Sequence, residues 1–226
     1  MDAFETRQKT LKKFEKEAGV YEKTPDGKFC SRIYPSIISE INATPFSSLL
    51  DIGCGTGSIL SGITGNAELF GIDFSGQMIE RARKSLKDKA KFVVGDAEFL
   101  PWADGYFDTV CCTFSFHHYP NPEKVLSEIN RVLKSKGRFI LADPWLPHLV
   151  SMLTNRFLHY SDGGDYHIYS SYEIKRLLGK SGFSLQSFKH PSNDSFLLTA
   201  QKPAKKNQVE NARNFTSGSD KKEYSK

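Results

Sequence analysis

The feature that most constrains this chain is an apolar run that ends beside a carboxylate and enters three alternate glycines. Residues 49–52 are apolar except for Asp51, then Gly53, Gly55 and Gly57 follow, and a helical pattern begins after them. Glycine accepts positive φ and lets a ligand approach the backbone without meeting a Cβ. The amides of such a loop, and of the helix that it opens, point toward the ligand. The pattern predicts a strand, a ligand-binding turn and a helix; a plain strand–helix turn is the alternative.

The spacing of these glycines argues against a nicotinamide dinucleotide as the ligand. The dinucleotide fingerprint is G-x-G-x-x-G, and Ser58 stands where its last glycine is needed. A carboxylate directly before the loop, at Asp51, suits a ligand that carries an ammonium better than one that carries a pyrophosphate. An NAD-dependent oxidoreductase is therefore disfavoured.

Two further carboxylates end the next two predicted strands. Asp73 lies 20 residues beyond Gly53, a separation at which an acidic residue can accept both ribose hydroxyls of an adenosine. Asp96 is placed to accept from an exocyclic amine, and the backbone amide of Ala97 is placed to donate to a ring nitrogen. Each aspartate alone is explained as well by a helix N-cap. Three strand-terminal carboxylates at one sheet edge, where open α/β folds bind ligands, favour a binding site.

The middle of the chain alternates short β-rich runs with helical stretches, which predicts a parallel sheet covered by helices. The expected strands are 48–52, 67–73, 91–96, 107–114 and 137–143, with helices over 76–87 and 122–134. A helix over 171–182 and two β-like runs, 183–188 and 195–201, follow. Before the alternation, helical patterns over 4–17 and 33–41 flank a turn-like stretch, 24–27.

This division predicts one principal domain. Residues 1–45 form an N-terminal helical cap, and 46–202 form the α/β domain. Within it, 144–171 is a lid segment, in which residues 149, 152, 153, 157 and 160 carry an apolar pattern at helical spacing. Residues 203–226, poor in large apolar side chains, are expected to be a disordered basic tail.

Composition limits the partners and the compartment. The net charge of +5 is concentrated in the tail, because seven basic and three acidic residues lie from Lys202 onward. A nearly neutral body argues against a broad nucleic-acid surface. No apolar run is long enough to span a bilayer, and the charged N-terminus does not match a secretory signal. The four cysteines form no C-x-x-C pair, so we expect neither disulfides nor a zinc site and predict a cytoplasmic protein.

Four motifs, in this order, resemble those of the class I S-adenosylmethionine-dependent methyltransferases, in particular the UbiE-like small-molecule branch. They are LLDIGCGTG, GIDFSGQMIERAR, GDAEFLPWADGYFDTV and FSFHHYPNPEKVLSEINRVLKSKGRFILAD. The resemblance implies a Rossmann-like, doubly wound, seven-stranded and mostly parallel sheet, of order 3-2-1-4-5-7-6 with the last strand antiparallel. It also implies S-adenosylmethionine as cofactor, with S-adenosylhomocysteine as product. No metal is expected, because His148, His159 and His167 have no matching cysteine or carboxylate cluster.

By the same resemblance, the glycines line the methionine and ribose, Asp73 binds the ribose diol, Asp96 binds the adenine amine, and Met78 packs on the adenine face. The cofactor-binding residues expected from the loop and from the resemblance are Asp51, Gly53, Cys54, Gly55, Gly57, Asp73, Phe74, Met78, Asp96, Ala97, Phe114 and Ser115.

Two adjacent histidines, His117 and His118, follow the fourth strand, beside the place where the fold presents the methyl group. Either is a candidate general base, since imidazole titrates near neutral pH. The alternative is that they cap the next helix or bond a carbonyl. Aromatic side chains expected near the sulfonium are Tyr21, Tyr34, Phe114, Phe116, Tyr119 and Trp145.

Three functions are left open. The first is a methyltransferase whose acceptor is an oxygen, nitrogen or sulfur atom of a small organic molecule. The second is a methyltransferase for an RNA or a protein that the basic tail brings close, and the third is a cofactor-binding protein without catalytic activity. The UbiE-like branch includes quinone-methylating enzymes, but an Arg-Asn pair is absent where His117 and His118 stand, which argues against a quinone acceptor. Monomer and homodimer both remain open.

Overall fold

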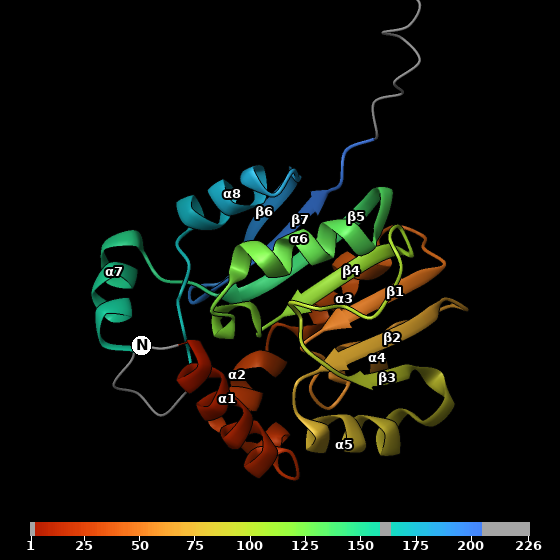
Figure 1. Ribbon diagram of the computed structural model, residues 1–226, viewed down its shortest axis with the longest axis horizontal. Helices are drawn as coiled ribbons and strands as arrows, with labels where there is room; N and C mark the ends of the chain where they lie inside the picture. The colour runs from red at the N-terminus through yellow and green to blue at the C-terminus, as the bar shows by residue number, and fades with distance from the viewer. Residues whose placement is uncertain (1–2, 159–163, 205–226) are drawn as a thin grey trace, which may run out of the picture.

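The computed structural model describes residues 3–158 and 164–204, which build one seven-stranded sheet (Figure 1). Its order is β3-β2-β1-β4-β5-β7-β6, as the resemblance implies. The strands are β1 Ser48–Ile52, β2 Glu68–Asp73, β3 Lys91–Val94, β4 Phe107–Thr113, β5 Leu133–Pro144, β6 Ser184–Ser192 and β7 Ser195–Gln201.

Strands β1 to β5 pair in parallel, whereas β7 runs antiparallel to both of its neighbours. In the parallel part, Leu50 of β1 lies in register with Phe70 of β2 and Val110 of β4. In the antiparallel part, Ile140 of β5 faces Thr199 of β7. The β6–β7 hairpin explains the reversal, because a short turn joins only antiparallel strands. The carboxyl ends of β1, β2, β3 and β4 therefore meet at one edge.

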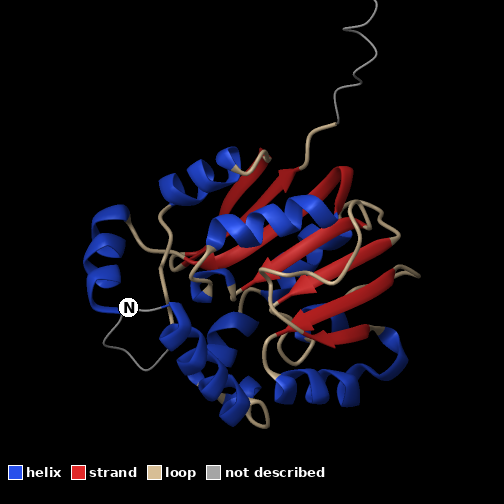
Figure 2. Ribbon diagram, in the orientation of Figure 1, coloured by secondary structure: helices blue, strands red, loops and turns tan. Residues whose placement is uncertain are grey.

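Helices cover both faces of the sheet (Figure 2). One face carries α6 (Pro122–Val132) and α8 (Ser171–Lys180), and the other carries α3 (Tyr34–Asn42), α4 (Ser58–Ser61) and α5 (Gly76–Leu86). Successive side chains of β1 point to opposite faces of the sheet. Leu50 therefore packs in the apolar core of the first face and Leu49 in that of the second. With both faces buried, the carboxyl edge is where a ligand can reach the backbone.

An N-terminal helical cap lies across that edge (Figure 1). It consists of α1 (Ala3–Glu17), the 3₁₀ turn η1 (Tyr21–Lys23) and α2 (Pro25–Ser31). The turn predicted over 24–27 was wrong, since these residues begin α2. Thr24 is its N-cap, with Oγ1 accepting from the Gly27 amide at 3.1 Å, and Pro25 occupies the first helical position, where a missing N–H costs nothing.

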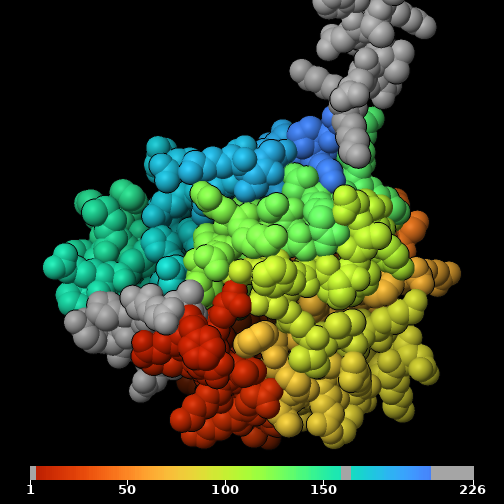
Figure 3. Space-filling view, viewed as in Figure 1, coloured from red at the N-terminus to blue at the C-terminus, as the bar shows by residue number. Residues whose placement is uncertain are grey.

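The amphipathic helix predicted after β5 is present as α7 (His148–Phe157), but it turns its apolar side chains outward. Leu149, Met152, Leu153 and Phe157 are all more than half exposed, while Ser151 is buried. In the space-filling view α7 projects at the left end of the molecule (Figure 3). Tyr160 and the tail from residue 205 lie outside the described residues. The remaining short turns are η2 (Lys87–Lys89) and η3 (Phe116–His118).

Across the described parts of the chain, every helix is too short or too polar to traverse a bilayer.

The N-cap of α2 gives a stability prediction. Thr24→Ala removes the side-chain oxygen that accepts from Gly27 and donates to the Tyr21 carbonyl at 2.7 Å, so the free energy of unfolding falls by about 1 kcal/mol. Thr24→Ser keeps the oxygen and is the matched control. Urea denaturation checks both; equal stability of the two variants would contradict the role of the cap.

Candidate functional site

The glycine loop adopts the left-handed backbone that its sequence predicts. Gly53, Gly55 and Gly57 have φ values of 69°, 51° and 82°. A Cβ at Gly53 would lie 2.4 Å from the Ser115 Oγ, so a larger residue is excluded there. A Cβ at Gly55 would instead enter open space. The loop is thus tight on its protein side and open on the other.

Asp73 joins the loop after β1 to the loop after β2. Its Oδ2 accepts from the Gly55 amide at 2.8 Å and its Oδ1 from the Ser75 amide at 2.9 Å. Burial raises the pKa of Asp73, and these two amides oppose the rise without cancelling it. The carboxylate therefore shapes the glycine loop as well as facing the cavity beside it.

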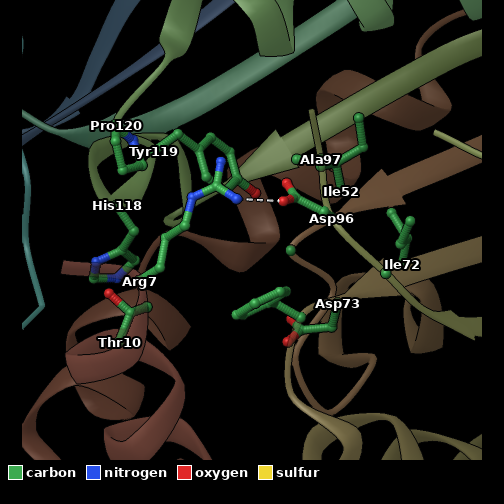
Figure 4. Close-up of a pocket in the computed structure, with 13 residues that line it drawn as sticks. Arg7, Thr10, Ile52, Ile72, Asp73, Asp96, Ala97, His118, Tyr119 and Pro120 are labelled. Carbon is green, nitrogen blue, oxygen red and sulfur yellow. Dashed lines mark hydrogen bonds and ion pairs between the residues drawn. The ribbon is translucent and has the colours of Figure 1, made fainter. Parts of the chain in front are cut away.

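The first hollow lies over the ends of β1, β2 and β3. Figure 4 shows its two sides: Asp73 and Asp96 extend from the sheet edge, and Arg7 and Thr10 reach in from α1. Its floor is apolar. The other lining residues are Ile52, Gly53, Ile72, Phe74, Gly95, Ala97, His118, Tyr119 and Pro120.

Arg7 ties α1 to this edge. Its Nη1 lies 2.5 Å from Asp96 Oδ2, and its Nη2 bonds Glu98. Asp96 Oδ1 also accepts from the Glu98 amide at 2.9 Å, and Asn121 donates to the Glu98 carboxylate. The carboxylate expected to accept from adenine is therefore already oriented by the cap, with lone pairs remaining on each oxygen for another donor.

A second hollow shares Gly53, Asp73 and His118 with the first and contains five more of the predicted residues, Cys54, Gly55, Met78, Phe114 and Ser115. Phe114 takes a φ of 52°, a costly conformation for a residue with a side chain. Ser115 Oγ donates to the Ile52 carbonyl at 3.1 Å and accepts from Tyr119. The full lining is Phe14, Tyr21, Tyr34, Gly53, Cys54, Gly55, Thr56, Ser58, Ile59, Asp73, Met78, Thr113, Phe114, Ser115 and His118.

Of the predicted cofactor residues, Asp51 and Gly57 lie outside both linings. Gly57 is the left-handed N-cap of α4. Asp51 is 1% exposed beneath the loop, where Oδ1 accepts from the Cys111 thiol at 3.4 Å and Oδ2 has no partner. Burial, with the nearby Asp73 charge, raises the pKa of Asp51 to about 7. The Asp51 carboxyl therefore faces the protein interior and lines neither hollow.

A third hollow adjoins the second and shares Phe14, Tyr21, Phe114 and His118 with it. The residues that it adds are a mixture of charged and apolar groups from the cap, from η3, from the end of β5 and from the segment after α7. They are Lys13, Asp26, Phe29, Cys30, His117, Pro144, Asp165 and Ile168.

The two histidines of the predicted base occupy different positions. His117 Nδ1 lies 2.8 Å from Asp143 Oδ1, whereas His118 Nδ1 donates to the Gly164 carbonyl at 2.9 Å. Burial lowers the pKa of His117, but the charge and hydrogen bond of Asp143 outweigh it, so that pKa is raised. Burial and the neighbouring His117 hold the pKa of His118 well below its ordinary value.

The aromatic residues divide between the site and the core. Tyr21, Tyr34, Phe114 and Tyr119 line the hollows. Phe116 is fully buried in the core of the α6 face, and Trp145 packs against that core.

Sequence reasoning missed Arg7, Lys13 and Asp165, because no local pattern relates the cap or the segment after α7 to the sheet edge. Asp143 carried a usable signal: like Asp73 and Asp96, it is a carboxylate near the end of a predicted strand.

Comparison with known proteins agrees with this geometry. The family model described as a methyltransferase domain matches residues 50–141. The demethylmenaquinone methyltransferase of Thermotoga maritima is 33% identical over 157 residues, covering 64% of this chain and 66% of that protein. Residues 50–141 are a methyltransferase domain of the class I S-adenosylmethionine-dependent type.

Solved structures show the same fold. YcgJ of Bacillus subtilis superposes with a TM-score of 0.68 at 20% identity, over 77% of this chain and all of that one. The PH0226 protein of Pyrococcus horikoshii superposes with a TM-score of 0.63 at 25% identity, over 83% and 98%. The chain spans less than two thirds of the length of the curated relatives that it matches.

The buried Asp51 gives a pH prediction. Because its folded pKa is raised above the unfolded value, the stability that it contributes is present at low pH and is lost as the pH rises through about 7. Between pH 6 and pH 8 the wild type loses about 1 kcal/mol from this group. Asp51→Asn removes the titration.

Urea unfolding of wild type and Asp51→Asn at both pH values gives the change in the free energy of unfolding with pH for each protein. The titrations of other groups cancel in the difference between the two proteins. Parallel pH dependences in the two proteins would show that Asp51 ionises with its ordinary pKa.

Proposed function

We propose that this chain transfers a methyl group from S-adenosylmethionine to an oxygen, nitrogen or sulfur atom of a small organic acceptor. One observation carries the proposal: a hollow lined by Asp73 and Asp96 continues past the glycine loop into a second hollow, which shares walls with a third. A cofactor site thereby adjoins a separate acceptor site.

The residues present fit the cofactor. Asp73 and Asp96 keep lone pairs for the ribose hydroxyls and the adenine amine, and Ile52 and Ile72 provide an apolar floor for a flat ring. Gly55 leaves the ligand side of the loop open, because a Cβ there would contact nothing. Met78 and Phe114 stand beside the loop, in the second hollow.

When bound, the cofactor supplies an electrophilic methyl group on a sulfonium. The chain's own contribution is alignment and exclusion of water. Phe14, Tyr21 and Phe114 form the apolar wall common to the second and third hollows, so an acceptor atom in the third hollow meets the methyl group away from bulk solvent. Aromatic faces also attract a cation, by about 0.5–2 kcal/mol.

The acceptor side supports a small molecule. The third hollow is bounded by the cap and by residues after β5, and it combines aromatic with charged groups. The curated relative from Thermotoga maritima is named for demethylmenaquinone. Removal of the acceptor proton by His117 or His118 stays a prediction. The cytoplasmic location and the choice between monomer and homodimer also stay predictions. The four cysteines are buried free thiols, which suits a reducing compartment.

The adenosine carboxylates give the decisive binding test. Asp96→Asn removes a charged acceptor, and Asp73→Asn also weakens the contact with Gly55, so affinity for S-adenosylmethionine falls about tenfold or more in both, with the greater loss in Asp73→Asn. Isothermal titration calorimetry with S-adenosylmethionine and S-adenosylhomocysteine measures these losses.

Two controls accompany that test. Asp88→Asn changes an exposed aspartate outside the hollows and keeps wild-type affinity. Arg7→Gln breaks the ion pair while keeping Asp96. If Arg7→Gln copied the loss seen in Asp96→Asn, the carboxylate would act by holding the cap and not by binding adenine.

Removal of the basic tail separates small acceptors from polymeric ones. Truncation before Pro203 keeps Lys202, whose Nζ bonds the Asn130 and Leu133 carbonyls, so the fold is retained. We expect unchanged release of S-adenosylhomocysteine across a panel of small metabolites. Activity on RNA or protein that disappears with the tail would favour a polymeric acceptor.

A further inference from the structure

A cluster of ligand atoms lies at the wall of the third hollow, away from the glycine loop. His117, His118 and Asp165 each offer one atom, and all three atoms lie within 4.8 Å of one another. Asp165 Oδ1 is 3.5 Å from His117 Nε2 and 3.4 Å from His118 Nδ1. Two ligands bound 2.0–2.1 Å from a tetrahedral ion are separated by about 3.4 Å. From this arrangement we propose that the two histidines and Asp165 bind a divalent transition metal ion.

The contact with Asp143 prepares His117 as a ligand. A carboxylate accepts, so the proton of His117 stays on Nδ1, and the lone pair of Nε2 faces Asp165. Metal-binding histidines generally donate their second nitrogen to a carboxylate in this way. Asp143 is fully buried, and its Oδ2 has no partner. Burial of a carboxylate with an unpaired oxygen costs free energy, and a role in orienting and polarising the metal ligand His117 explains why Asp143 is placed there.

The backbone brings Asp165 to the histidines. The amides of Tyr166 and His167 both donate to the His117 carbonyl, at 2.8 and 3.0 Å, which places the preceding carboxylate beside the imidazoles. The facing lone pairs of His117 and Asp165 need a cation between them, either a proton or a metal ion. This juxtaposition explains why the sequence alone predicts no metal: the third ligand comes from a distant segment with no ligand spacing.

Two neighbouring groups bear on the site. His118 Nδ1 donates to the Gly164 carbonyl, and metal binding replaces that bond. Thr10 Oγ1 lies 2.9 Å from this carbonyl and 2.9 Å from the Thr6 carbonyl, so its one proton is available to the Gly164 oxygen when the bond from His118 is lost. Lys13 lines the same hollow; its Nζ bonds Asp26 at 2.6 Å, and its charge also interacts with the charge of Asp165.

Two imidazoles and one carboxylate suit borderline ions such as Zn²⁺, Co²⁺ or Fe²⁺ better than Mg²⁺ or Ca²⁺, which take mainly oxygen. Three protein ligands leave a coordination position free, as in catalytic rather than structural sites. His117, His118 and Asp165 all line the third hollow, so an oxygen or nitrogen atom of a bound acceptor is the class of ligand that would complete the coordination.

The test uses the full chain without an affinity tag, stripped with EDTA. We expect Zn²⁺ titration calorimetry to give one ion per chain, and Co²⁺ to give the visible absorption of a four- or five-coordinate site. Asp143→Asn should weaken Zn²⁺ binding 10- to 100-fold, and Asp165→Asn at least as much. His167→Gln is the matched control, because His167 also contacts a carboxylate, Glu173 at 3.2 Å, outside the trio.

A readout on the wild type covers variants that fail to fold. Zn²⁺ should raise the unfolding temperature of the wild type and of His167→Gln, reversibly with EDTA, because a ligand of the native state stabilises it. Absence of stoichiometric Zn²⁺ and Co²⁺ binding by the wild type, or an equal loss in His167→Gln, would overturn the proposal and leave a proton between His117 and Asp165. The proposal does not rest on methyl transfer: cofactor affinity is measured separately and can fail or hold independently.

Discussion

A parallel sheet with both faces covered leaves only its edges for chemistry, and the rest of this molecule follows from that constraint. Helices α6 and α8 bury one face and α3, α4 and α5 bury the other. The backbone that stays accessible is the loop after each strand at the carboxyl edge. Asp73 then joins two of these loops through the Gly55 and Ser75 amides, so the geometry of the edge depends on one buried carboxylate.

The cap forms the side of the hollows that lies opposite the sheet edge. Arg7 reaches Asp96 and Glu98, and Phe14 and Tyr21 stand opposite the glycine loop. Phe14 and Tyr21 thus line both the second and the third hollow.

Ionisable groups gather in and beside the third hollow, and of these Asp143, His117 and His118 are buried. Asp143, His117, His118 and Asp165 come from three separate segments, and the amides of Tyr166 and His167 hold two of those segments together. Burying these groups is costly unless a cation or a proton balances them. Their grouping beside Phe114, where the two inner cavities meet, is the physical reason to look for metal binding there.

Much of the fold was predictable from local sequence. The alternation of apolar runs and helical stretches located the strands and their helices, and the strand-terminal carboxylates located Asp73 and Asp96 in one cavity. The turn predicted over 24–27 was wrong because Thr24 and Pro25 are as typical of a helix start as of a turn. The helix α7 was predicted, but periodicity alone cannot tell whether an apolar stripe faces the core or solvent.

The sequence by itself determined the strand–loop–helix unit, the conformation of its glycines and the carboxylates at the strand ends, because each depends on residues close together in the chain. Tertiary structure alone decided that Asp51 lies beneath the loop, that Arg7 holds Asp96, and that Asp165 meets His117 and His118. Those contacts join distant segments, and no local preference of the backbone encodes which distant side chains will share a cavity.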